Sequence, residues 1–253
     1  MSETPGDVVV LHSLGLTGRA YAALDAELPH RRLHRPDLRG HGDAADVLPA
    51  TLPGMADDIA ALVRRLAAQA GRPVHLVGHS LGGAVAGLVA QRCADLLASV
   101  TVIASPATGL PVFRERARDA ERHGMAPQVE ATLRRWFASP EQGGPAVAAA
   151  RAGLESLTVA TWAAIWRSFA DFPGWAALGL PDGFGERLLC LSFAEDRSTP
   201  PSALAQIAEA CGGHHVAVGH GGHMAPLEEP ALLAAHLESH WTRLAATGEE
   251  AHA

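Results

Sequence analysis

The sequence predicts an α/β protein with a mainly parallel sheet of about six strands, flanked by helices. Three observations lead to this fold class. Short runs rich in β-branched residues alternate with longer helical patterns along the chain. Two of these runs are nearly all apolar, which is typical of central strands buried on both faces. The 253 residues, 48% of them apolar and 19% charged, are enough for one folded unit with a sizeable core.

The expected strands follow one another along the chain, each as a short apolar or β-branched run. They are DVVVLH at 7–12, RLHRP at 32–36, PVHLVGH at 73–79, SVTVIAS at 99–105, RLLCLSF at 187–193 and HHVAV at 214–218. Helical patterns occupy about 18–28, 53–70, 81–97, 200–211 and 227–246. Helices placed between strands act as crossovers, so neighbouring strands run parallel.

A long stretch without strand signals interrupts this alternation at about 106–186. It contains four of the five tryptophans of the chain. An insertion at the carboxyl end of a strand overhangs the crevice where open parallel sheets bind ligands. We therefore expect an α/β core formed by residues 1–105 and 187–253, with an inserted helical cap at 106–186. A separate helical domain is the alternative.

The tetrapeptide His-Ser-Leu-Gly occurs twice, at 12–15 and at 79–82. A nucleophilic serine must be exposed on a sharp strand-to-helix turn, and the residues two before and two after it come so close that both must be small. The second copy has Gly78 and Gly82 at these positions, whereas the first copy has Leu11 two residues before its serine. We therefore expect Ser80, and not Ser13, to be the nucleophile.

A serine nucleophile needs a histidine base and an acid, which follow it in the order acid, then histidine, in this architecture. Asp196 follows the fifth expected strand and is the expected acid, with Glu195 as a rival and Asp182 as a weaker one. His223 follows the last expected strand and is the expected base, although His220 lies in the same loop.

The reaction also needs two backbone N–H groups that stabilise an oxyanion. The residue after the nucleophile, Leu81, supplies one of them. The loop after the first strand supplies the other, and its candidate donor is Leu14, at the matching place in the first tetrapeptide.

Five segments together resemble α/β-hydrolase-fold enzymes. They are LHSLGLTG at 11–18, DLRGHG at 37–42, GHSLGG at 78–83, EDRSTPP at 195–201 and GGHMAPLEEP at 221–230. Within that superfamily, the run RHGMAPQVEATLRRWF at 122–137 is similar to 3-oxoadipate enol-lactonases. The resemblance implies a cytoplasmic hydrolase without a cofactor that opens an enol-lactone in aromatic catabolism.

The chain departs from that family where relatives have His-Gly in the first loop and this chain has His12-Ser13. The Ser13 hydroxyl could therefore contact the substrate. A carboxylate-bearing lactone would also need a cation, which Arg134 or Arg135, beside Trp136, could supply; the alternative is that both arginines are solvated on a cap helix. In the segment RGHG at 39–42 we expect hydrogen bonds under the site.

Composition argues against several other classes of protein. The net charge is −7 and no basic face dominates, so nucleic-acid binding has little support. No stretch of 18 apolar residues predicts a membrane span, and the first residues show no export signal, so a cytoplasmic protein is expected. The three widely spaced cysteines and the histidines suggest neither a disulfide framework nor a metal site. Self-association as a homo-oligomer stays open.

These observations favour a serine hydrolase that cleaves a small-molecule ester or lactone through an acyl-enzyme. The same three residues could serve a C–C bond hydrolase, a thioesterase, a cofactor-free haloperoxidase or a lyase. A third hypothesis is a ligand receptor or interaction module on a hydrolase scaffold, which an intact set of catalytic residues disfavours.

Overall fold

A computed structural model of the protein describes residues 6–250, and describes side chains as far as residue 247. Its centre is a parallel sheet of six strands in the order β2-β1-β3-β4-β5-β6. The strands are β1 (Gly6–Leu11), β2 (Arg31–His34), β3 (Val74–His79), β4 (Leu97–Ile103), β5 (Leu188–Phe193) and β6 (His214–Val218). The predicted fold class and all six predicted strands are confirmed, with ends shifted by one or two residues.

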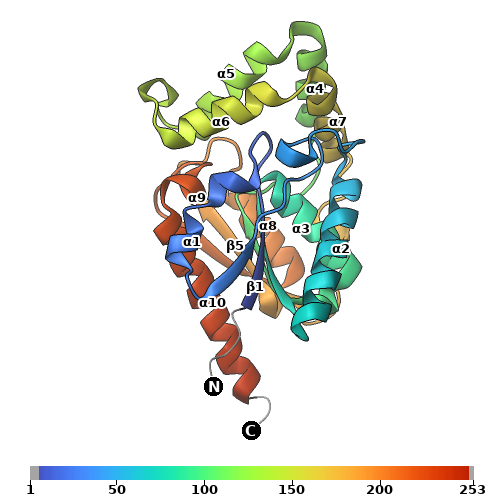
Figure 1. Ribbon diagram of the computed structural model, residues 1–253, viewed down its shortest axis with the longest axis vertical. Helices are drawn as coiled ribbons and strands as arrows, with labels where there is room; N and C mark the ends of the chain where they lie inside the picture. Colours follow the sequence, from blue (N-terminus) through green and yellow to red (C-terminus); the bar gives the residue numbers. More distant parts are fainter. Residues whose placement is uncertain (1–5, 251–253) are drawn as a thin grey trace.

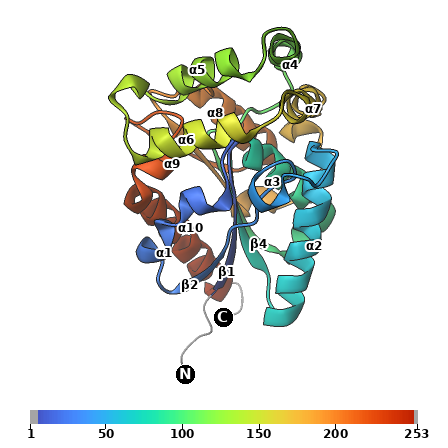
Figure 2. The ribbon, with the colours of Figure 1, turned by 45° about the horizontal axis from the view of Figure 1, so that its top comes forward.

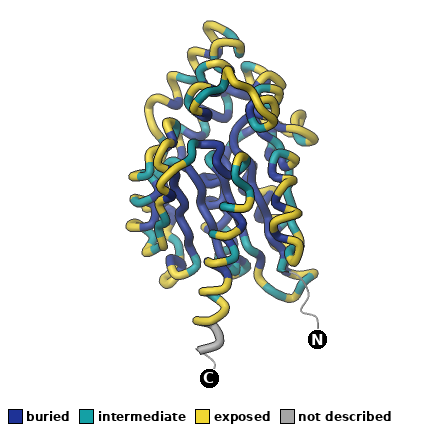
Figure 3. Tube along the Cα trace, turned by 90° about the vertical axis from the view of Figure 1, so that its left-hand side faces the viewer, coloured by how far each residue is buried: buried dark blue, intermediate teal, exposed yellow. Residues whose placement is uncertain are grey.

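Helices cover both faces of this sheet (Figure 1). Those of the core are α1 (Leu24–Glu27), α2 (Leu52–Ala70), α3 (Leu81–Cys93), α8 (Pro201–Cys211), α9 (Ala225–Glu228) and α10 (Pro230–Glu250). Helices α2 and α3 pack together on one face, and α1 packs with α10 on the other. The four inner strands, β1, β3, β4 and β5, are almost wholly buried between these layers, as the dark centre of the tube in Figure 3 shows.

Two expected helices are interrupted in the structure. The stretch 18–28 forms a 3₁₀ turn, Gly18–Tyr21, and then the single turn α1. The Gly18 N–H donates to Asp37 Oδ1 (2.7 Å), so this segment is fastened as a loop beside the sheet. The stretch 227–246 is divided at Pro230, which begins α10, because proline lacks the N–H that would continue α9.

The helical segment 106–186 forms a layer above the carboxyl ends of the strands (Figure 2). Its helices are α4 (Pro111–His123), α5 (Met125–Trp136), α6 (Pro145–Ser156) and α7 (Val159–Ala170). Helix α4 packs against α7, and α5 packs against α6. This layer therefore lies over the edge of the sheet where the loops that follow β1, β3, β5 and β6 meet. In residues 6–250, no helix is both long and apolar enough to cross a membrane.

Candidate active site

Ser80 occupies the sharp turn between β3 and α3. Its backbone has φ 53° and ψ −110°, a conformation that L-residues adopt only at a cost of about 1–3 kcal/mol. The Ser80 N–H donates to the carbonyl of Ile103 on the neighbouring strand (2.8 Å), and the Gly83 N–H donates to the Ser80 carbonyl (2.9 Å). These bonds hold the strained residue at the edge of the sheet, where its side chain keeps partial exposure.

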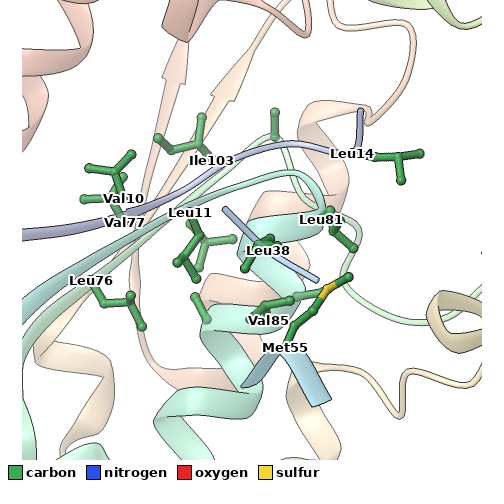
Figure 4. Packing of buried hydrophobic residues seen from close by; sticks show 14 of the residues in the cluster. Val10, Leu11, Leu14, Leu38, Met55, Leu76, Val77, Leu81, Val85 and Ile103 are labelled. Atoms are coloured by element: carbon green, nitrogen blue, oxygen red, sulfur yellow. The ribbon is translucent and has the colours of Figure 1, made fainter. Parts of the chain in front are cut away.

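The two glycines around Ser80 are required by contact with backbone atoms. A Cβ on Gly78 would lie 2.3 Å from the Gly82 carbonyl oxygen, and a Cβ on Gly82 would lie 2.5 Å from the Leu11 carbonyl oxygen. Neither backbone atom can rotate away, as the end of a flexible side chain could. Leu11 of the first strand therefore packs directly on this turn, among the apolar side chains shown in Figure 4.

Three side chains from different loops form one hydrogen-bonded chain. Ser80 Oγ lies 3.1 Å from His223 Nε2, and His223 Nδ1 lies 2.8 Å from Asp196 Oδ2. The other carboxylate oxygen accepts from the N–H groups of Ser198 (2.7 Å) and Thr199 (2.8 Å), which fix its orientation. The Asp196 and His223 side chains are each 1% exposed. With His223 Nδ1–H donating to Asp196, Nε2 is left to accept the Ser80 proton.

The rival residues lie outside this chain. Glu195 and Asp182 are exposed, and His220 is an exposed residue that pairs with Glu229 at 3.1 Å. In the part of the chain that the structure describes, no cluster of three histidines, cysteines or acids is placed to hold a metal ion. The structure thus brings together the three residues selected from the sequence.

His79, the neighbour of Ser80, has a role that the sequence did not suggest. Its Nε2–H donates to the backbone carbonyl of His223 (2.9 Å), and the Tyr21 hydroxyl donates to its Nδ1 (2.5 Å). Burial, followed by the nearby His223, holds the pKa of His79 well below its usual range, so the ring stays neutral. Tyr21 is the single tyrosine of the chain, which was the one available signal.

The first tetrapeptide forms a loop held by two histidines. The Gly15 N–H donates to His41 Nε2 (3.0 Å), and the Leu38 N–H donates to His12 Nε2 (2.9 Å). Burial, assisted by His41, lowers the pKa of His12 to about 3, and burial also lowers the pKa of His41. Both rings are therefore neutral acceptors. The hydrogen bond that we expected under the site is formed by His41. Arg39 instead forms a bidentate ion pair with Asp58 on α2.

The two expected oxyanion donors are placed at matching positions. Leu14 and Leu81 are both buried, and each follows the serine of its tetrapeptide. Within residues 6–250, neither of their backbone N–H groups donates to another protein group. Two buried N–H donors without an acceptor are what a developing oxyanion would require.

The helical segment contacts this edge of the sheet at two points. The Trp136 ring stacks on the His223 imidazole, with centroids 5.7 Å apart and planes 26° apart. Helix α6 presses on the first loop so closely that a Cβ on Gly153 would lie 1.8 Å from the Gly15 carbonyl oxygen. The segment therefore helps to enclose both the base and the first loop.

The remaining expected site residues differ in placement. Ser13 is fully buried, and its Oγ has no hydrogen-bond partner. Arg134 is exposed on α5, in agreement with a solvated arginine. Arg135 is half-buried and donates from Nη2 to Thr132 Oγ1 (2.9 Å).

A parallel sheet with a serine on a strained strand-to-helix turn, joined to a histidine and an aspartate from later loops, defines the α/β-hydrolase class. The chain belongs to the alpha/beta hydrolase family, whose family model matches residues 8–236.

Similar proteins include both esterases and a lactonase. A pimeloyl-[acyl-carrier protein] methyl ester esterase from Vibrio vulnificus is 36% identical over 124 residues, 49% of this chain and 43% of that protein. The chain spans about half the length of the curated relatives it matches. A thermophilic esterase from Thermogutta terrifontis (TM-score 0.80, 26% identity) covers 95% of this chain and 91% of its own. The enol-lactonase from Burkholderia xenovorans LB400 (TM-score 0.80, 23% identity) covers 94% and 92%.

Proposed function

We propose that the protein is a serine hydrolase that cleaves a carboxylic ester or lactone. The observation that carries this proposal is the continuous chain of hydrogen bonds from Ser80 through His223 to Asp196. It lies beside the two unbonded N–H groups of Leu14 and Leu81. A serine that is hydrogen-bonded to a general base, beside a preformed oxyanion site, is the arrangement that acyl transfer needs.

The first half of the proposed reaction forms an acyl-enzyme. The Ser80 hydroxyl gives its proton to His223 Nε2 as its oxygen bonds to the carbonyl carbon of the substrate. The carbonyl oxygen becomes an oxyanion that accepts from the Leu14 and Leu81 N–H groups. The oxyanion then reforms the carbonyl and the bond to the ester oxygen breaks, while His223 gives its proton to that oxygen. An ester releases an alcohol at this point, whereas the hydroxyl or enol of an opened lactone stays attached to the acyl group.

In the second half, His223 takes a proton from water, and the hydroxide attacks the acyl carbon. The bond to Ser80 breaks, and the serine recovers the proton from His223. Asp196 stabilises the imidazolium in both halves through its bond to Nδ1, while the Ser198 and Thr199 N–H groups hold it in place.

The proposed substrate is a small lactone or ester, with 3-oxoadipate enol-lactone as the specific candidate. The similarity of the run 122–137 to such lactonases supports the candidate, as does the likeness of the fold to an enol-lactonase structure. The stacking of Trp136 on His223 supports a substrate space bounded by the helical segment. Thioesters and vinylogous diketones are the competing substrates.

The test is turnover of the enol-lactone compared with p-nitrophenyl acetate, an acyl-thioester and a vinylogous diketone. We expect the lactone to give the highest kcat/KM, and Ser80→Ala to lower kcat by roughly 10⁶-fold, as in other triads. Ser239→Ala, an exposed serine on α10, is the matched control and should not change kcat. Substantial turnover by Ser80→Ala, or no labelling of Ser80 by a fluorophosphonate, would overturn the proposal.

A further inference from the structure

Two arginines of the helical segment lack the carboxylate partners that other arginines have. Most other half-buried arginines form ion pairs, and these are Arg31, Arg35, Arg39, Arg92 and Arg151. Arg116 on α4 and Arg135 on α5 are also half-buried. Within the described side chains, neither of them contacts an aspartate or a glutamate.

Their surroundings disfavour two positive charges. Burial, followed by the charge of Arg135, lowers the pKa of Arg116 to about 10. Burial and the charge of Arg134 lower the pKa of Arg135. A buried cation without a counterion is unfavourable, and a second cation nearby adds repulsion. The arrangement therefore lacks an anion that would compensate both charges.

A third hydrogen-bond donor lies against Arg116. Trp166 on α7 is 7% exposed, and its Nε1–H has no acceptor. The Arg116 guanidinium lies over the Trp166 ring, 4.5 Å from its centroid. The Arg135 Nε–H is likewise buried without an acceptor, while Nη2 of that residue is held by Thr132. We call Arg116, Arg135 and Trp166 the donor cluster.

The chemistry of the donor cluster selects its ligand. It presents only donors, two of them cationic, and therefore fits a group that only accepts. An ionised carboxylate has two acceptor oxygens and matches the fork of a guanidinium. Along α5, Arg135 directly precedes Trp136, whose ring stacks on His223, so the cluster belongs to the part of the helical segment that adjoins His223.

We propose that the donor cluster binds a carboxylate carried by the substrate, away from the bond that is cleaved. This inference rests on the proposed function and narrows it to anionic half-esters and carboxylated lactones. Arg134, which the sequence offered equally, is exposed and is not part of this cluster. Arg116, which sequence reasoning missed, takes its place.

The test compares two esters of nearly equal length, mono-p-nitrophenyl glutarate and p-nitrophenyl valerate. We expect the wild-type protein to prefer the glutarate ester by about 10-fold or more in kcat/KM. Arg116→Gln and Arg135→Gln should each lower kcat/KM for this ester by about 10- to 100-fold, the usual effect of losing a hydrogen bond to a charged group. Hydrolysis of the valerate ester should change less than about 3-fold. Arg118→Gln, an exposed arginine on α4, is the control and should change neither.

A binding measurement separates recognition from catalysis. Glutarate is titrated into Ser80→Ala protein while tryptophan fluorescence is recorded, with and without Arg116→Gln. Weaker glutarate binding in the double variant supports the proposal. Equal binding in both, or equal losses for both esters in the arginine variants, overturns it. If wild-type protein hydrolyses the valerate ester through Ser80 without preferring the glutarate ester, only this inference fails. If Ser80→Ala still hydrolyses both esters, the proposed function fails.

Discussion

The two His-Ser-Leu-Gly segments lie side by side, because β1 and β3 pair in parallel with Leu11 opposite Gly78. Each tetrapeptide therefore leaves the same edge of the sheet at the same height. Nevertheless, the serines differ in backbone conformation, burial and hydrogen bonding. Ser80 has a positive φ, is partly exposed and bonds to His223, whereas Ser13 has an ordinary φ, is fully buried and has no partner for its hydroxyl.

The histidines of the two copies also have different partners. His12 accepts the Leu38 N–H and so fixes the loop that carries Leu14. His79 donates to the His223 carbonyl and so fixes the base. Tyr21, which follows the first copy in the chain, connects it to the second, since its hydroxyl bonds to His79. The comparison teaches that the residue before the tetrapeptide and the partners from distant loops determine the role of an identical sequence.

We expect the largest effect when the second copy receives a side chain at Gly78, the position where the first copy has Leu11. In Gly78→Ala the added Cβ would lie 2.3 Å from the Gly82 carbonyl oxygen, so the turn must distort. We expect a loss of about 3 kcal/mol in the free energy of unfolding. We also expect kcat to fall by at least about 100-fold, because misplaced reacting groups are costly. Urea denaturation and ester hydrolysis measure these effects.

The matched control for that variant is Gly219→Ala. Gly219 has no positive φ, and a Cβ there would meet nothing within 4 Å. It should therefore change stability by less than about 0.5 kcal/mol. Wild-type kcat and stability in Gly78→Ala would show that the turn does not depend on a glycine.

Acidification should lower the free energy of unfolding through the histidines of both copies, His12 and His79. His12 and His79 are neutral in the folded protein because burial lowers their pKa values, that of His12 to about 3. Unfolded histidine has a pKa of about 6.5, so the unfolded chain takes up protons as the pH falls below that value while the folded chain does not. Stability is therefore fully present above about pH 6.5. It falls towards pH 3 by up to about 1.4 kcal/mol per pH unit for each histidine.

Urea denaturation at pH 7 and at pH 5 measures this slope. In His12→Gln the unfolded chain takes up about one proton fewer, so the free energy of unfolding should depend less steeply on pH. His123→Gln, which changes an exposed histidine on α4, should leave this dependence unchanged. A free energy of unfolding that is the same at both pH values would show that these rings are not held neutral.

Tyr21→Phe tests whether the copies are coupled. The substitution keeps the ring and removes the hydroxyl that donates to His79 Nδ1, leaving a buried acceptor without a partner. We expect a loss of about 1–3 kcal/mol in stability. We also expect kcat to fall by about 10-fold with little change in KM. The reason is that a displaced His79 ring would move His223, to which it donates, and not the bound substrate. A rise in KM at constant kcat would instead place Tyr21 in substrate binding.

Local sequence was sufficient for the fold and for the sharp turn that carries Ser80, because their determinants are short. Apolar runs specify the six strands, and the pair Gly78 and Gly82 specifies the turn. Asp196 and His223 could be found because each follows a strand end. The donor cluster could not, because Arg116 and Trp166 lie 50 residues apart, and only the packing of α4 on α7 brings them together. The same holds for Tyr21 and His79.

The smallest expected effect concerns Ser13, the position where the resemblance to enol-lactonases implies a glycine. Because Ser13 has no positive φ, its Cβ is tolerated without strain, so glycine is not required by the backbone. Ser13→Gly removes a buried hydroxyl without a partner, which stabilises the variant. The glycine also raises the conformational entropy of the unfolded chain, which destabilises the variant by about 0.5–1 kcal/mol. These effects oppose each other, so stability should change by less than about 1 kcal/mol. The space opened beside the Leu14 N–H should raise kcat/KM for bulkier esters relative to p-nitrophenyl acetate. If hydrolysis of all esters fell by 10-fold or more, the Ser13 hydroxyl would itself support the oxyanion, and the two copies would be less different than their partners indicate.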